Sequence, residues 1–150
     1  MITESDAITL VSRSCALLDD EKFDDYLNLF AADGHYRITT YSPDLRRELI
    51  YLDLDRADLA ALLQNVPRHV RMSGRLMRHP NGFLVDSKDD ESSVMTSLLV
   101  IHTDLEGNSR IFAAGRYRDQ LTLVDGKPAI KSREVRLDTR QFGPGSHVPL

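Results

Sequence analysis

The chain is poor in cysteine, in long apolar runs and in basic residues near its start. Cys15 is the single cysteine among 150 residues. A disulfide, a thiolate zinc site or an iron–sulfur cluster needs at least two cysteines, so one copy of the chain can build none of them. No apolar run approaches the roughly 20 residues that a membrane helix requires. The acidic, polar start also differs from a secretory signal, and we expect a soluble, cytoplasmic protein.

The chain also has no excess of basic over acidic residues. The 19 lysines and arginines are interleaved with 23 acidic residues, which gives a net charge of -4 and a pI near 5.7. Such a chain does not attract a phosphate backbone at long range, so nucleic-acid binding is disfavoured. No internal repeat or low-complexity block divides the sequence, and a chain of this length can bury about 70% of its unfolded surface. We predict a single domain over residues 1–150.

Helical patterns come first in the chain. Apolar residues at helical spacing predict a helix over about 5–19, behind a capping-box pattern at Thr3 to Asp6. A short second helix is predicted from a cap at Asp20 through Phe30, ending before Asp33-Gly34. A third is predicted over about 56–64, capped by Asp53 or Asp55 and stopped by Pro67.

The other segments predict a sheet. One strand is expected over 35–41, and four long ones over about 70–76, 93–103, 110–124 and 129–138. The turns Glu106-Gly107-Asn108 and Asp125-Gly126 predict that the last three strands form consecutive antiparallel hairpins. We expect the acidic part of residues 80–92 to be a solvated connection and the tail from Gln141 to be extended. Because helices gather before a meander, the pattern predicts an α+β fold with a curved sheet over the helices.

Five segments carry a resemblance to a known family when their order and spacing are taken together. They are Leu17–Asp24, Leu29–Tyr36, Tyr51–Arg56, Arg68-His69 and Arg133–Asp138. The chain resembles, over nearly its whole length, the small (beta) subunits of aromatic-ring-hydroxylating dioxygenases. These belong to the cone-shaped superfamily of nuclear transport factor 2 and scytalone dehydratase. The resemblance implies N-terminal helices packed in the concave face of a strongly curved, mainly antiparallel sheet, a cystatin-like roll.

The resemblance also implies a function without catalysis in this chain. The large (alpha) subunit is expected to hold the Rieske iron–sulfur cluster and the mononuclear iron. Three large and three small subunits would form a hexamer around a homotrimer of this chain, acting on an aromatic, benzoate-like compound. The composition agrees, because a Rieske centre needs two cysteines and two histidines and Cys15 stands alone. We therefore expect no metal and no catalytic residue here, and neither nucleic acid nor membrane as a partner.

Two alternative sites compete with this interpretation. Asp25, Tyr36, His69 and Arg71 could meet in the mouth of the cone, where a free-standing dehydratase, isomerase or small-molecule-binding protein would use them. The structural interpretation, a solvated helix face and a core tyrosine, is preferred because one fold hosts many activities. His69, His79 and Asp86 supply the residue types of an iron-binding facial triad, but their spacing does not force them together.

Seven residues are candidates for a subunit interface. Arg116 and Arg118 alternate with Phe112 and Ala114, and Arg133 is expected on the same face of the neighbouring strand. Arginine is enriched at protein interfaces, although an exposed sheet paired with carboxylates explains the pattern equally well. Polar and aromatic residues also interrupt an apolar run at Tyr51, Asp53, Asp55 and Arg56, which suits either a contact or a helix cap. Cys15 is predicted to be a small core residue.

Overall fold

Three helices and six strands form within the part of the chain that the computed structural model describes, residues 1–66, 73–141 and 149–150. In chain order they are α1 (Glu4–Asp19), α2 (Phe23–Leu27), β1 (Phe30–Ser42), β2 (Arg47–Asp55), α3 (Arg56–Asn65), β3 (Arg75–Lys88), β4 (Glu91–Thr103), β5 (Ser109–Val124) and β6 (Lys127–Leu137). None of these three helices is long and apolar enough to cross a membrane.

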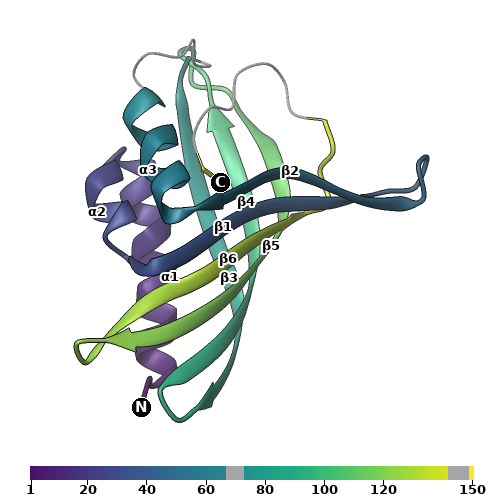
Figure 1. Ribbon diagram of the computed structural model, residues 1–150. Coiled ribbons are helices and arrows are strands. Elements are labelled where there is room, and N and C mark those ends of the chain that lie inside the picture. The colour runs from purple at the N-terminus through teal and green to yellow at the C-terminus, as the bar shows by residue number, and fades with distance from the viewer. Residues whose placement is uncertain (67–72, 142–148) are drawn as a thin grey trace.

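The six strands make one curved sheet in the order β2-β1-β6-β5-β4-β3. Neighbouring strands are antiparallel except β1 and β6, which run parallel from His35–Ser132 to Thr40–Leu137. Figure 1 shows the helices gathered on one side of this sheet, with α1 lying across its concave face. The α+β prediction is therefore confirmed, with a mainly antiparallel sheet wrapped over N-terminal helices.

Helix α1 packs against the concave face of the sheet. Thr3 and Asp6 form the predicted capping box, each side chain bonding the other's backbone N–H. Such reciprocal bonds satisfy two donors that a helix start leaves open. The inward side of α1 is buried against the sheet through Ala7, Leu10, Val11, Ser14, Cys15 and Leu18.

Several predicted boundaries are wrong. The second helix ends at Leu27, far short of Phe30, because Phe30 already pairs with Ile130 in the sheet. Asp20 is not its cap but the C-cap of α1. Strand β2 was not predicted. Residues 80–92 are not a loop, since β3 and β4 continue as a hairpin out to the pair Lys88–Glu91, and their charges lie on its exposed side.

The other strand predictions hold. Strands β4, β5 and β6 form the predicted meander, and the turn between β5 and β6 has positive φ at Asp125 and Gly126, as a two-residue hairpin turn requires. Asp55 caps α3 as expected. The strand predicted from residue 70 and the extended tail lie largely outside the described residues.

Candidate functional site

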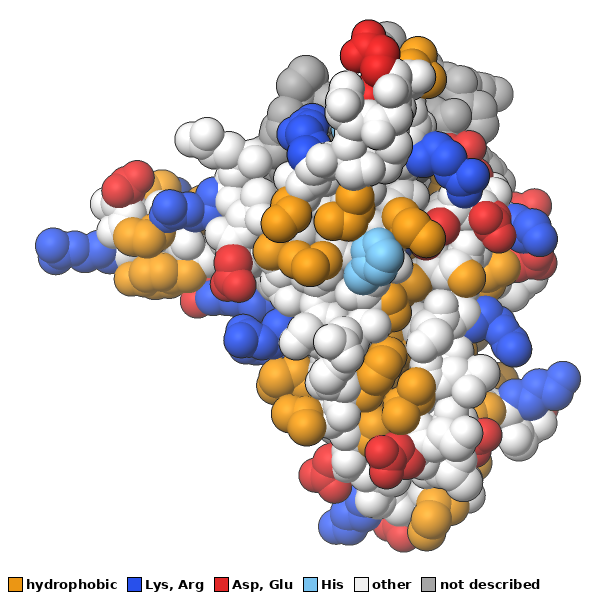
Figure 2. Space-filling view, turned by 180° about the vertical axis from the view of Figure 1, so that it is seen from behind, with side chains coloured by type: hydrophobic (Ala, Val, Ile, Leu, Met, Phe, Trp, Pro, Cys, Tyr) orange, Lys and Arg blue, Asp and Glu red, His pale blue; other side chains and the backbone are white. Residues whose placement is uncertain are grey.

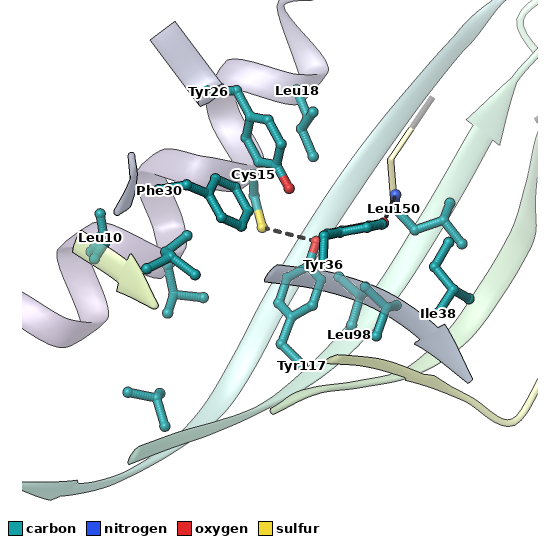
Figure 3. Packing of buried hydrophobic residues seen from close by; sticks show 14 of the residues in the cluster. Leu10, Cys15, Leu18, Tyr26, Phe30, Tyr36, Ile38, Leu98, Tyr117 and Leu150 are labelled. Atoms are coloured by element: carbon teal, nitrogen blue, oxygen red, sulfur yellow. Dashed lines mark hydrogen bonds between the residues drawn. The ribbon is translucent and has the colours of Figure 1, made fainter. Parts of the chain in front are cut away.

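Three tyrosines from different elements meet inside the cone, at the place where a pocket was considered. Tyr26 comes from α2, Tyr36 from β1 and Tyr117 from β5, and each is 0% exposed. In Figure 3 the Cys15 sulfur lies beside the Tyr117 hydroxyl, whereas the Tyr36 hydroxyl points to the backbone nitrogen of Leu150. The Cys15 Sγ is 3.7 Å from the Tyr117 hydroxyl. The ring of Tyr26 meets that of Phe30 edge to face. This arrangement fills the interior with aromatic side chains.

A buried ion pair lies against the same cluster. The Arg133 guanidinium donates through Nε and Nη2 to the two carboxylate oxygens of Asp119, both at 2.8 Å. It also donates to the Ser14 hydroxyl at 2.9 Å, and its Cζ lies 4.0 Å from the centre of the Tyr117 ring. Both charged side chains are 0% exposed. A paired, hydrogen-bonded geometry of this kind is what allows charges to remain in a core.

Residues 149 and 150 close the cluster from another side. The backbone N–H of Leu150 donates to the Tyr36 hydroxyl at 2.9 Å, and Leu150 is 2% exposed. The carbonyl of Pro149 accepts from Arg78 at 2.6 Å, and the same guanidinium donates to Asp19 at 2.8 Å. The Tyr36 hydroxyl is thus already engaged by the chain itself.

The electrostatics of the cluster work against acid–base chemistry near neutral pH. Burial raises the pKa of Tyr26 to about 12, and it raises the pKa values of Tyr36 and Tyr117 as well. The pKa of the Cys15 thiol is also raised by burial. Burial alone would lower the pKa of Arg133, but the charge and hydrogen bonds of Asp119 help raise it well above its usual value. The cluster therefore combines neutral hydroxyls, a neutral thiol and a permanently paired cation.

Of the alternative catalytic group, the structure describes Asp25 and Tyr36. Asp25 is exposed on α2, whereas Tyr36 is completely buried, so the two share no solvent-accessible pocket. His69 and Arg71 lie outside the described residues. His79 and Asp86 are exposed at separate positions on β3. Within residues 1–66, 73–141 and 149–150, no group of three or more His, Cys, Asp or Glu side chains is placed to hold a metal ion.

The outer face of the sheet carries only part of the predicted cationic surface. Arg116 and Arg118 are exposed there, and Arg118 pairs with Glu134 at 3.6 Å. Arg133 points to the opposite, inner face, so its predicted direct contact with another subunit is wrong. Phe112 also faces inward, because an irregularity in the β4–β5 pairing buries both Phe112 and Ala113 and shifts the alternation.

The four candidates around β2 have contacts within the chain. Tyr51 donates its hydroxyl to the Arg140 carbonyl at 3.3 Å, and Asp53 pairs with His35. Asp55 accepts the backbone N–H of Asp58 at 2.8 Å as the N-cap of α3. Arg56 reaches the carbonyl of Leu27 at 3.4 Å. The contacts of Asp55 and Arg56 explain these two residues structurally, while Tyr51 and Asp53 stay exposed enough to meet another chain.

Comparison with known proteins places this geometry in a family. The sequence profile of the SnoaL-like domain matches residues 2–134. The chain belongs to the SnoaL-like domain family. It is 36% identical over 135 residues to the beta subunit of 2-aminobenzenesulfonate 2,3-dioxygenase from Alcaligenes sp., with 89% of this chain and 90% of the relative covered. It is 32% identical over 150 residues to the beta subunit of the methanesulfonate monooxygenase hydroxylase from Methylosulfonomonas methylovora, covering 93% and 83%.

Solved structures agree with this SnoaL-like assignment. The beta subunit of benzoate 1,2-dioxygenase from Burkholderia mallei superposes with a TM-score of 0.76 at 19% identity, covering 92% of each chain. Proteins with a cystatin-like fold match as well. The resemblance to oxygenase beta subunits, predicted from the sequence, is confirmed.

The main feature that sequence reasoning missed in this SnoaL-like chain is the buried ion pair. A usable signal was present. On β5, Asp119 lies two residues from Tyr117 and from Leu121, so all three point to the same face of the sheet. On β6, Arg133 points to the same face as Val135 and Leu137. Tyr117, Leu121, Val135 and Leu137 are all buried. Strict alternation on two paired strands therefore predicts a carboxylate and a guanidinium side by side in the core.

Proposed function

We propose that this SnoaL-like chain is the non-catalytic small subunit of a Rieske-type oxygenase, and that it supports the assembly of the catalytic large subunit. Its curated relatives at 36% and 32% identity are beta subunits of oxygenases, and the similarity covers most of both chains in each case. A free-standing enzyme with the same fold would need a pocket with an acid or a base. The alternative function near Asp25 and Tyr36 is therefore not favoured.

The filled interior of the cone is the observation that carries the proposal. The Tyr36 hydroxyl, the group best placed to polarise a substrate carbonyl, belongs to a side chain that is 0% exposed, and it accepts a hydrogen bond from the backbone N–H of Leu150. The buried cation of Arg133 is fully engaged by Asp119 and Ser14. Side chains that are paired and packed in this way make a core rigid. The outer surface is then the part of the protein that binds other subunits.

The cofactors are proposed to belong to the partner. A Rieske cluster takes two cysteines and two histidines, and this chain offers Cys15 alone, buried against Tyr117. The large subunit would therefore hold both the cluster and the mononuclear iron. We further propose the three-plus-three hexamer, in which a homotrimer of this chain positions neighbouring large subunits. Tyr51, Asp53, Arg116 and Arg118 remain candidates for contacts within it.

The relatives also suggest a substrate class for the complete enzyme. Both curated relatives above 30% identity are named for sulfonates, one aromatic and one aliphatic. We propose a sulfonate as the substrate of the complex in preference to a benzoate-like carboxylate. Specificity would lie in the pocket of the large subunit, so this chain would contribute to it only by holding that subunit in place.

Co-expression tests the proposal. The chain is produced alone and together with a large oxygenase chain of the same genome that carries the two-cysteine, two-histidine Rieske pattern, and each product is purified for iron analysis and mass determination. The chain alone should be colourless, iron-free and inactive, whereas the pair should form a stable iron-containing complex that oxidises a sulfonate. Tyr36→Phe should leave turnover of the complex unchanged. Dehydratase or isomerase activity of the isolated chain that Tyr36→Phe abolishes would contradict the assignment.

A further inference from the structure

The ribbon of β1 and β2 extends beyond the rest of the sheet. The pairing of β1 with β6 stops at Thr40–Leu137, whereas its pairing with β2 continues to Ser42–Arg47. Figure 1 shows this two-stranded projection leaving the body of the molecule. We call residues 41–50 the arm. An isolated two-stranded hairpin is marginally stable in water, so an arm of this kind is stabilised by a surface that covers it.

The arm is apolar along its length and basic at its tip. Tyr41 is 46% exposed, and Leu45 and Ile50 are each 57% exposed. The arm carries two arginines, Arg46 and Arg47, and two acids, Asp44 and Glu48, and Glu48 is paired with Arg136. Arg46, Arg47 and Asp44 are exposed at the tip. The arm therefore suits a partner surface that is apolar in its centre and acidic at its ends.

A surface with these properties lies on the outer face of β3, β4 and β5. The register brings large exposed side chains together there, which we call the patch: Met77, Leu84, Met95, Leu99 and Ile111. They are 40–68% exposed. Figure 2 shows the hydrophobic side chains of this face around a single histidine. Their exposed area is about 500 Å², in the range of functional patches and more than half of one side of a standard interface.

The ends of the patch are acidic. Asp104 and Glu106 lie in the turn between β4 and β5, and Asp89 and Asp90 lie in the turn between β3 and β4. Between these turns, a hollow of about 410 Å³ is lined in part by Leu84, Met95 and Arg118. The patch thus has apolar side chains, a recess beside Leu84 and Met95, and carboxylates at both ends. Arg116 and Arg118 lie on the same face, opposite Ser97 and Met95, and Arg118 is paired with Glu134.

We propose that the arm of one copy docks on the patch of a second copy, and that contacts of this kind close the homotrimer. The inference rests on the proposed function for the number of copies. The arm and the patch match in apolar character and in charge, and every chain carries one of each. Because the two surfaces differ, the contact is head-to-tail, and a head-to-tail contact closes into a ring when its rotation allows.

Two variants and a mixture test this geometry. Leu45→Asp alters the arm and Leu99→Asp alters the patch, while Val124→Asp serves as a control on an exposed residue, 43% accessible, outside both surfaces. Far-UV circular dichroism and thermal unfolding establish that each variant is folded. Analytical ultracentrifugation should show a trimer for the parent chain and for Val124→Asp. Each of the other two variants should require about tenfold or more higher concentration to assemble, because a charge enters an apolar contact.

The mixture separates a head-to-tail contact from a symmetric one. Equal amounts of Leu45→Asp and Leu99→Asp should give a dimer and nothing larger, since the intact arm of one variant meets the intact patch of the other once. A variant that forms the trimer by itself at the concentration at which the parent chain does, or the absence of a dimer in the mixture, overturns the proposal. So does a parent chain that is monomeric, or a patch variant that still trimerises but no longer binds the large subunit. Binding of the large subunit by the parent chain is measured in parallel. If the parent chain binds it, the proposed function holds even where the contact between arm and patch is refuted.

Discussion

Removing one partner of the ion pair between Asp119 and Arg133 should destabilise the protein more than any exposed substitution. Two hydrogen bonds of 2.8 Å join the two side chains, and both are 0% exposed. Arg133→Met leaves the carboxylate of Asp119 buried without its cation. Breaking a buried pair in this way costs about 3–5 kcal/mol. For a domain of this size each kcal/mol lowers the melting temperature by about 2–4 °C, so the fall should be about 6–20 °C.

The double variant Arg133→Met with Asp119→Leu provides the decisive comparison. It replaces both charges by apolar groups, and exchanging a buried pair for packed hydrophobic residues is often neutral or stabilising. We expect its free energy of unfolding to lie within about 2 kcal/mol of the parent and well above that of either single variant. Urea unfolding followed by circular dichroism measures all four proteins. One protein concentration is used throughout, since association shifts apparent stability.

An exposed ion pair serves as the control for the loss of stability at the buried pair. Lys131 and Glu91 lie 3.2 Å apart with side chains 49% and 63% exposed. Lys131→Ala should cost less than about 1 kcal/mol, because solvent screens such pairs. The reasoning fails if Arg133→Met costs no more than this control. It also fails if the double variant loses the full sum of the two single losses, since the charges would then act independently.

Three further predictions follow from local geometry and burial. Asp55→Ala should destabilise the protein by about 1 kcal/mol and Asp55→Asn by much less, because only the former removes the cap of α3, and thermal unfolding distinguishes them. Gly115→Ala should lower the free energy of unfolding by about 3 kcal/mol or more, because the added Cβ would lie 2.1 Å from the carbonyl oxygen of Arg136. At Gly126 an added Cβ meets no atom within 4 Å, so Gly126→Ala should cost only the strain of its positive φ. Because burial raises the pKa of Tyr26 to about 12 in the folded state, its contribution to stability is complete below pH 10 and is lost as the pH rises from 10 through 12, so urea midpoints should fall across that window.

The sequence predicted the elements whose signals are local. The capping box at Thr3 and Asp6 and the two-residue turn at Asp125-Gly126 each satisfy a backbone requirement within a few residues, and both formed as predicted. The meander of β4, β5 and β6 followed from its turns and its alternation. These features depend little on the remainder of the fold.

Features that depend on distant pairing were harder to predict. The charges of Asp86 and Lys88 favour a loop in the sequence, but they lie on the exposed side of β3, an edge strand, where polar residues are tolerated. Arg133 is expected from the sequence on a cationic sheet face with Arg116 and Arg118, whereas its alternation with the buried Val135 and its register opposite Asp119 place it in the core. The end of α2 was missed because Phe30 is taken by a strand roughly a hundred residues away.

The parallel pairing of β1 with β6 has a consequence for synthesis of the chain. Strand β1 lies between β2 and β6, yet β6 is the last in chain order of the six described strands. Until residue 137 emerges, one edge of β1 stays unpaired and the carboxylate of Asp119 lacks its cation. Closing a loop of about a hundred residues is slow compared with helix or hairpin formation, so the nascent protein passes through a stage with an open, adhesive sheet edge. Chaperones that bind unpaired strand edges should therefore act on the nascent chain until β6 has emerged.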